Sequence, residues 1–222
     1  TIYTKNNNMQ LLKEIGNTPM IKISKGLYAK AELLNPTGSI KDRPASWILN
    51  IQKPKERGFD TICEATSGNM GVSFAWLAAT LGLKCVIIMP DNMSTERKQT
   101  LDYYGAKLIE VPAGDFDGAI AYRDELCEEF GWFNCNQFAN KYNIESHFFT
   151  TGAEILQWAI DEKKDISAVV TGTGTGGTLM GVEQRLRPNF PDMKMVAVEP
   201  AESAVMSGGE PGLHGIQGIG DG

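Results

Sequence analysis

The sequence predicts an α/β protein built on mostly parallel sheets. Short apolar runs alternate with helix-like stretches along the chain, and several of those stretches end at a glycine that can cap a helix. Hydrophobic residues make up 42% of the 222 residues and charged residues 22%, which is ordinary for a globular protein with a core. Strands separated by helices require right-handed crossovers, and such crossovers place neighbouring strands parallel.

The first half of the chain is predicted to form three strands and three helices. Three apolar runs have the length of strands, namely YAKAELL, TICEAT and KCVIIMP. A helix follows NPTGSIKDRP, because Pro44 lacks an N–H and therefore fits the first turn of a helix. Gly82 and Gly105 are placed to end the next two helices. The predicted strands are 28–34, 61–66 and 84–90, and the predicted helices are 44–52, 71–82 and 95–105.

The second half repeats this alternation. Apolar runs again precede helix-like stretches, and Gly131 can end the helix-like stretch that comes before it. The predicted strands are 106–112, 132–138, 167–172 and 194–200, and the predicted helices are 118–130, 152–160 and 177–187. The sequence then stops in GIQGIGDG, a glycine-rich loop with no closing helix or strand. Domains seldom end in this way, so we expect the sequence to be incomplete at its C-terminus.

Composition restricts the classes of partner. The net charge of −6 argues against nucleic acid or an anionic membrane as the partner. We find no apolar run of about 18 residues and no signal-peptide pattern, so we expect a cytoplasmic protein without a membrane span. The sequence has only two histidines, which argues against a histidine-rich metal site, and no metal is expected. None of the four cysteines belongs to a C-x-x-C pair, and we expect buried free thiols at Cys63, Cys85, Cys127 and Cys135.

The stretch TGTGTGGTLMG, residues 171–181, is a candidate phosphate-binding loop. It follows a predicted strand and opens a helix, so its backbone N–H groups and the helix dipole can hold an anion. Thr175 and Thr178 add hydroxyl donors. The loop also contains G-x-G-x-x-G, with Glu199 at the end of the next strand, which is the pattern of a dinucleotide-binding site. A plain tight turn is the third interpretation. The glycines of that dinucleotide pattern are Gly172, Gly174 and Gly177.

The stretch EATSGNMGV, residues 64–72, is a second loop between a strand and a helix. Thr66, Ser67 and Asn69 carry short polar side chains, and a helix N-terminus binds a carboxylate for the same reason that it binds a phosphate. Ordinary N-capping of the helix is the alternative. In an α/β sheet, ligands bind beyond the carboxyl ends of the strands, where both loops must lie.

Lys41 and Asp221 are two charged residues in turn-rich segments. Lys41 lies between NPTGSI and a helix start, and it is either a solvated lysine or one directed into a site. Asp221 lies in the glycine-rich loop at the end of the sequence, where a solvated carboxylate is the simplest interpretation. A phosphate loop, a carboxylate loop and a lysine together suggest a phosphorylated cofactor that handles an amino acid.

These motifs resemble those of the fold-type II pyridoxal-phosphate enzymes, in particular cysteine synthase and its cystathionine β-synthase relatives. The resemblance runs from IGNTPMIKI to GIQGIGDG and includes NPTGSIKDR, EATSGNMG, CNQF, TTGAEI and GTGTGGTL in order. It implies two α/β domains with mostly parallel sheets, like those of the tryptophan synthase β subunit. The larger would contain residues 1–35 and 142–222, and the smaller, mobile one residues 36–141. It also implies a homodimer.

The resemblance assigns roles to residues of the glycine-rich loops, to Lys41 and to Gln137. Lys41 would hold pyridoxal 5'-phosphate as a Schiff base, and Asn69 would hydrogen-bond the 3' oxygen of its ring. Gly218 would line the substrate mouth. The cofactor phosphate would be held by Gly174, Thr175, Gly176, Gly177 and Thr178, and the substrate carboxylate by Thr66, Ser67, Gly68, Met70 and Gln137.

The implied activity is β-replacement or β-elimination on L-cysteine, O-acetyl-L-serine or L-serine through an aminoacrylate. Lysine chemistry suits it, because a freed amine can act as the base on the Cα proton. Two positions depart from the family pattern. Met70 replaces a threonine, so that position offers only its backbone N–H. Asp221 replaces a small residue and would repel a sulfide anion but could activate water, which suggests conversion of L-cysteine to L-serine with release of hydrogen sulfide.

Three alternatives stay open at this point. The chain could be a standard O-acetylserine sulfhydrylase. It could be an NAD-binding oxidoreductase that uses the dinucleotide pattern, although this leaves Lys41 and the 64–72 loop without roles. It could also be a non-catalytic scaffold of the same fold.

Overall fold

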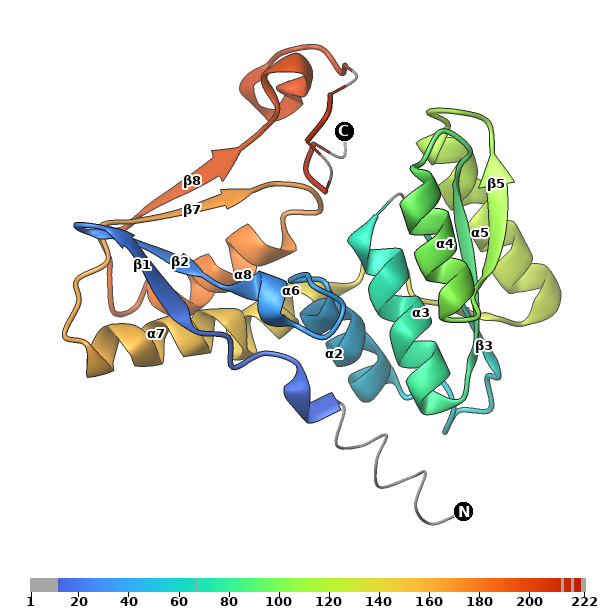
Figure 1. The fold of residues 1–222 in the computed structure, drawn as a ribbon, viewed down its shortest axis with the longest axis horizontal. Coiled ribbons are helices and arrows are strands. Elements are labelled where there is room, and N and C mark those ends of the chain that lie inside the picture. Colours follow the sequence, from blue (N-terminus) through green and yellow to red (C-terminus); the bar gives the residue numbers. More distant parts are fainter. Residues whose placement is uncertain (1–11, 67, 213, 217, 221–222) are drawn as a thin grey trace. The chain divides into compact units, whose positions relative to one another are not determined.

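The computed structural model describes residues 12–66, 68–212, 214–216 and 218–220, and it confirms an α/β fold (Figure 1). The chain forms two compact units. Unit 1 contains residues 12–15 and Glu32–Asn140, and unit 2 contains Gly16–Ala31 and the described residues from Lys141 onward.

Unit 1 is built on a four-stranded parallel sheet with the strand order β5-β4-β3-β6. Ile62 in β3 pairs with Cys85 on one side and with Phe133 on the other, so β3 is a central strand. Parallel pairing of consecutive strands through helical crossovers was the arrangement predicted from the sequence. The strands are β3 (Thr61–Ala65), β4 (Lys84–Pro90), β5 (Lys107–Val111) and β6 (Phe133–Asn134).

Helices cover both faces of this sheet (Figure 1). Val86 and Ile88 of β4 pack in one cluster with Leu126 of α5, whereas Ile87 points to the opposite face, where it lies against Gly71 of α3. Gly82 takes the left-handed conformation that ends α3, as the sequence predicted. The helices are α2 (Asp42–Gln52), α3 (Asn69–Leu81), α4 (Thr95–Tyr103) and α5 (Phe116–Phe130), with short 3-10 turns at η1 (Leu12–Glu14) and η2 (Glu32–Leu34).

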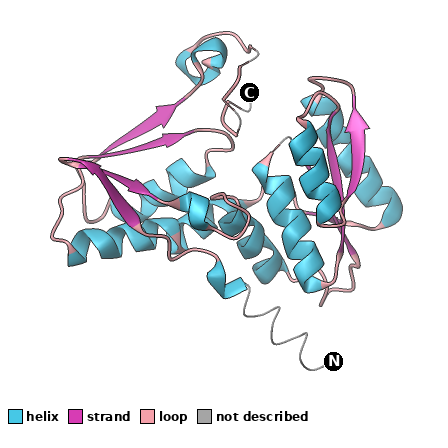
Figure 2. Ribbon diagram, viewed as in Figure 1, coloured by secondary structure: helices cyan, strands magenta, loops and turns pink. Residues whose placement is uncertain are grey.

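Unit 2 contains two two-stranded sheets and three α-helices (Figure 2). One sheet is antiparallel, formed by β1 (Met20–Ser24) and β2 (Leu27–Lys30), and the other is parallel, formed by β7 and β8. Ile155, Val182, Leu186 and Met193 form a buried core cluster. The remaining elements are α6 (Lys141–Phe149), α7 (Thr151–Asp161), β7 (Ala168–Gly172), α8 (Gly177–Leu186), β8 (Lys194–Val198), η3 (Ala201–Ser203) and η4 (Val205–Ser207).

Two predicted strands are shorter than expected. The strand expected at 28–34 ends at Lys30, because the N–H and the side-chain amide of Asn35 both donate to the Glu32 carbonyl and close a turn. The strand expected at 132–138 is reduced to Phe133–Asn134, because Asn136 has a φ of 49° and turns the chain out of the sheet. Strand β1 and helix α6 were not predicted at all. KYNIESHFF, the sequence of α6, is mixed in polarity and carries no clear helical signal.

The prediction for the cysteines is confirmed, because all four thiols are free and buried. Within the described part of the chain, no helix combines the length and the apolar character that crossing a membrane requires.

Candidate active site

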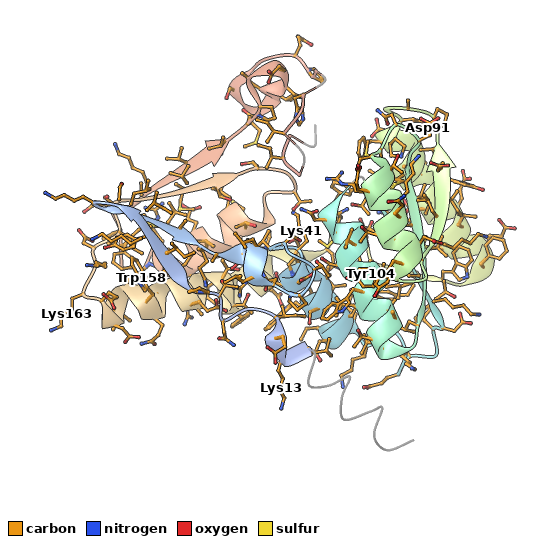
Figure 3. All side chains as sticks on the ribbon, viewed as in Figure 1. Lys13, Lys41, Asp91, Tyr104, Trp158 and Lys163 are labelled. Carbon is orange, nitrogen blue, oxygen red and sulfur yellow. The ribbon has the colours of Figure 1, made fainter. Side chains whose placement is uncertain are left out.

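Lys41 immediately precedes α2 in unit 1 (Figure 3). Its side chain is half-buried. The next residue, Asp42, is fully buried and accepts hydrogen bonds from the Thr37 N–H at 2.7 Å and the Thr37 hydroxyl at 2.5 Å. The Ser73 hydroxyl of α3 lies 2.6 Å from the same carboxylate. Pro44 lies in the first turn of α2, as predicted. A buried carboxylate therefore anchors the turn that presents Lys41.

The predicted carboxylate loop leads from β3 into α3. Gly68 is the residue before α3 and donates its N–H to the Thr66 hydroxyl oxygen at 3.2 Å. Asn69 begins the helix with an exposed side chain, so its amide is available to a ligand. Met70 is only 1% exposed, so its side chain belongs to the core and the position can offer only its backbone N–H. Ser67 lies outside the described residues.

Gln137 lies at the end of β3, beside this loop, although more than 60 residues separate the two in the sequence. Its backbone N–H donates to the Glu64 carboxylate at 2.9 Å, and its side-chain amide donates to the Ala65 carbonyl at 3.1 Å. The side chain is 5% exposed. Unit 1 therefore brings Thr66, Gly68, Asn69 and Gln137 together at the carboxyl end of β3, where the N-terminus of α3 can attract a carboxylate.

Glu64 and Arg123 form a buried ion pair at this end of β3 that sequence analysis missed. The carboxylate and the guanidinium are 3.0 Å apart, and both side chains are at most 2% exposed. Burial raises the pKa of Glu64 to about 7, against the opposing effects of Arg123 and of the Gln137 and Ala65 N–H donors. A signal existed, because Glu64 is a charged residue inside an apolar strand run, which is rare unless the charge is paired.

The predicted phosphate loop joins β7 to α8 in unit 2. Gly176 has a φ of 76°, and α8 begins at the next residue. The N–H groups of the first helical turn have no partner in their own helix, and the hydroxyls of Thr175 and Thr178 lie in the same segment. The first turn of α8 carries no acidic side chain. This set of donors at a positive helix end fits a phosphate group.

Helix α6 contacts this loop through Asn143 and His147. Asn143 donates from its side-chain amide to the Thr175 hydroxyl oxygen at 2.9 Å. The Nε2 atom of His147 lies 3.3 Å from the Thr178 hydroxyl, and its Nδ1 atom lies 2.9 Å from the Thr151 hydroxyl. Sequence analysis missed both residues because it did not predict α6.

The C-terminal loop runs alongside the phosphate loop. The Gly220 N–H donates to the Thr173 carbonyl at 2.8 Å, and the side chain of Ile219 lies against Gly172. Gly218 is exposed in the same loop and has a φ of 89°. Asp221, predicted as catalytic, lies outside the described residues.

Glu199, the acidic residue of the dinucleotide pattern, is engaged locally. Its carboxylate accepts hydrogen bonds from the Met206 N–H at 2.6 Å and the Ser207 hydroxyl at 2.8 Å. It therefore holds the turn at η4, which is a structural role.

Comparison with known families identifies this arrangement. The model of the family described as pyridoxal-phosphate dependent enzyme matches residues 11–221. This chain belongs to the pyridoxal-phosphate dependent enzymes. The predicted family and its cofactor are confirmed, and the alternatives of an NAD-dependent oxidoreductase and of a non-catalytic scaffold are set aside.

Relatives and solved structures refine the assignment within the pyridoxal-phosphate dependent enzymes. Cysteine synthase from Staphylococcus aureus (strain Mu50 / ATCC 700699) is 44% identical over 220 residues, which cover 94% of this chain and 70% of that protein. A hydrogen sulfide-producing enzyme from Fusobacterium nucleatum is 36% identical with a TM-score of 0.87, over 97% of this chain and 68% of that one. O-ureido-L-serine synthase is 39% identical with a TM-score of 0.86, over 94% and 68%. The chain is thus similar in sequence to cysteine synthases and in fold to these two enzymes.

Proposed function

We propose that this enzyme catalyses β-replacement or β-elimination on a β-substituted L-amino acid, with L-cysteine, O-acetyl-L-serine or L-serine as candidates. The observation that carries the proposal is the clustering of Thr66, Gly68 and Gln137 at the carboxyl end of β3, next to the N-terminus of α3, whose first N–H groups suit an amino-acid carboxylate. Similarity to cysteine synthases supports the same class of reaction.

In this proposal each loop binds one part of the reacting system. Lys41 binds the cofactor through its amine and, once released, removes the Cα proton of the substrate. Asn69 orients the cofactor ring through its 3' oxygen. Gly218 lines the substrate mouth. The cofactor, when bound, supplies the electron sink for this chemistry. The residues proposed to hold its phosphate are Gly174, Thr175, Gly176, Gly177 and Thr178, and those proposed to hold the substrate carboxylate are Thr66, Ser67, Gly68, Met70 and Gln137.

We further propose that the enzyme adds water to the substrate and releases hydrogen sulfide from L-cysteine. In this reaction the Cβ–S bond breaks, a Cβ–O bond to water forms, and the products are L-serine and hydrogen sulfide. Asp221 would accept the proton of the attacking water, and its negative charge would disfavour an incoming sulfide anion. A hydrogen sulfide-producing enzyme among the similar structures supports this proposal.

The test is the product balance from L-cysteine in the wild type, Asp221→Asn and Asp221→Ala. We expect the wild type to form sulfide and L-serine in equal amounts. Asp221→Asn keeps the shape of the side chain but removes the base, and loss of a general base lowers L-serine formation by about 10²- to 10⁴-fold. Equal L-serine formation in Asp221→Ala and the wild type would sink the proposal for Asp221.

A standard O-acetylserine sulfhydrylase is the second candidate, favoured by the 44% identity to cysteine synthases. It joins sulfide to O-acetyl-L-serine and releases acetate. Faster L-cysteine formation from O-acetyl-L-serine and sulfide than L-serine formation from L-cysteine would support this candidate instead.

We also propose a cytoplasmic homodimer with the domain division implied by the resemblance, namely residues 36–141 against residues 1–35 with 142–222. The two compact units differ from this division only near its borders, because residues 12–15 and 32–35 belong to unit 1 and Lys141 belongs to unit 2. Light scattering during gel filtration measures the assembly directly, and a mass of one chain would contradict the dimer.

A further inference from the structure

We propose that Asn143 and His147 of α6 position the hydroxyl groups of Thr175 and Thr178 to donate to the cofactor phosphate. The inference rests on the proposed assignment of residues 174–178 to the phosphate. It makes Asn143 and His147 positioning residues, because they act through the two threonines.

Asn143 fixes the direction of the Thr175 hydroxyl. Its side-chain amide donates to the Thr175 oxygen at 2.9 Å. A hydroxyl has one hydrogen, so a hydroxyl whose oxygen already accepts a bond can turn its hydrogen toward a second acceptor. Asn143 is 3% exposed, and a Cβ added at Gly177 would lie 2.3 Å from its amide oxygen. The amide is therefore held directly behind the first residue of α8.

His147 can do the same for Thr178 in one of its neutral tautomers. The ring is 1% exposed, and both of its nitrogens face hydroxyls. With the proton on Nε2, the ring donates to the Thr178 oxygen and leaves the Thr178 hydrogen for a phosphate, while the Thr151 hydroxyl donates to Nδ1. With the proton on Nδ1, the Thr178 hydrogen is directed to the ring instead. A bound phosphate favours the first tautomer.

The packing of α6 on α8 holds these contacts in register. Asn143 and His147 are four residues apart and therefore share one face of α6. Gly181 lets α8 approach that face, because a Cβ there would lie 2.4 Å from the Ile144 carbonyl oxygen and 2.7 Å from the His147 Cβ. Helix α6 thus becomes part of the phosphate site without touching the phosphate.

The test compares two variants at His147 that differ in which ring nitrogen they imitate. Glutamine places its amide nitrogen near the position of Nε2, so His147→Gln can still donate to Thr178, whereas asparagine reaches only the position of Nδ1. We expect His147→Gln to bind pyridoxal phosphate within about threefold of the wild type. We expect His147→Asn to raise the dissociation constant about 10-fold or more, because a hydrogen bond to a charged group is weakened.

Asn143→Asp supplies an independent arm, because aspartate has the shape of asparagine but only accepts hydrogen bonds. It removes the donor to Thr175 and adds a negative charge near the phosphate. We therefore expect a 10- to 100-fold rise in the dissociation constant of pyridoxal phosphate, which corresponds to roughly one or two lost charge-assisted hydrogen bonds. Lys141→Ala, at an exposed position of α6, is the matched control. If the aspartate variant does not fold, Asn143→Ala and the His147 pair carry the test.

Dissociation constants are measured for pyridoxal phosphate and for pyridoxal, on the full chain stripped of cofactor. Positioning of the phosphate predicts a loss for pyridoxal phosphate alone and a changed phosphorus NMR shift of the bound cofactor. Equal losses for both ligands, or His147→Gln as weak as His147→Asn, would overturn the inference.

Thr175→Val and Thr178→Val separate this inference from the proposed assignment of residues 174–178 to the phosphate. If they leave pyridoxal phosphate binding unchanged, the phosphate assignment fails; if they weaken it while the α6 variants do not, only this inference fails.

Discussion

At the scale of single residues, buried carboxylates support the loops that we propose carry the chemistry. Asp42 anchors the turn before α2 through Thr37 and reaches Ser73 of α3, whose hydroxyl also lies 3.0 Å from the Asn69 carbonyl. Glu64 ties Gln137 to the end of β3. These two residues flank the proposed site without being assigned to it, and each costs free energy to bury unless its partners are in place.

The proposed role of Lys41 predicts a coupled loss in Lys41→Ala. The visible absorbance of the lysine-bound cofactor should disappear, and loss of the base should lower turnover by about 10²- to 10⁴-fold. Absorbance spectra and turnover of the purified variant measure both effects. Lys13→Ala, at an exposed lysine near the start of the sequence, is the control and should retain both (Figure 3). A visible band that persists in Lys41→Ala would contradict the assignment.

The raised pKa of Glu64 predicts a stability that falls as pH rises. The folded state holds the Glu64 proton up to a pKa of about 7, whereas the unfolded chain releases it near the ordinary glutamate pKa of 4.5. Between these pH values the folded state binds more protons, so its stability decreases with pH and then levels off above about 7.

Glu64→Gln keeps the size of the side chain but cannot titrate, so its unfolding free energy is the reference for the pH dependence of the wild type. We expect the wild type to lose up to about 3 kcal/mol of unfolding free energy relative to Glu64→Gln between pH 5 and pH 8, since one pKa unit corresponds to about 1.4 kcal/mol. Urea unfolding at several pH values measures the difference. Parallel curves for the two proteins would show that the Glu64 pKa is not raised.

At the scale of elements, the contact between α6 and α8 supports the proposed phosphate loop. Two glycines lie where a Cβ would collide with a neighbouring helix. At Gly181 it would meet Ile144 and His147 of α6, and at Gly152 it would meet Arg185 of α8 and His147 of α6. Small residues therefore set the spacing of α6, α7 and α8. The helices can be this close only because these positions have no side chain.

Gly181→Ala is expected to force α6 and α8 apart. Overpacking of this kind costs about 1–3 kcal/mol of unfolding free energy. It should also weaken pyridoxal phosphate binding, because Asn143 and His147 would move away from the threonines. Thermal unfolding and cofactor titration measure the two effects. Gln184→Ala, on the exposed face of the same helix, should change neither. An unchanged melting temperature in Gly181→Ala would mean that the backbone can shift freely here.

At the scale of the whole molecule, a cofactor that binds only the folded chain must raise its stability. At a pyridoxal phosphate concentration of 100 times the dissociation constant, the gain is about 2.7 kcal/mol. Thermal unfolding with and without the cofactor measures this gain, and the same concentration of inorganic phosphate is the control. No shift at saturating cofactor would be inconsistent with the proposed binding residues.

The sequence alone predicted much of this molecule because its signals are local. Alternating apolar runs and glycine caps located β3, β4, β5, β7 and β8, with boundaries within one or two residues at most strands. The dense glycine loops pointed to phosphate and carboxylate binding, since helix starts and flexible backbone act over a few residues. The family resemblance carried by these motifs is confirmed.

Only the tertiary structure decided how the supporting residues pair. Gln137 reaches Glu64 across 73 positions, and Arg123 reaches it across 59. Asn143 reaches Thr175 across 32 positions, from a helix whose own sequence gave no sign of its conformation. Helix α6 is formed by packing on α8 more than by its own preferences, and packing is a long-range interaction that no local pattern records. The sequence thus determined which loops meet the cofactor and substrate in our proposal, whereas the fold decided which buried side chains hold those loops in place.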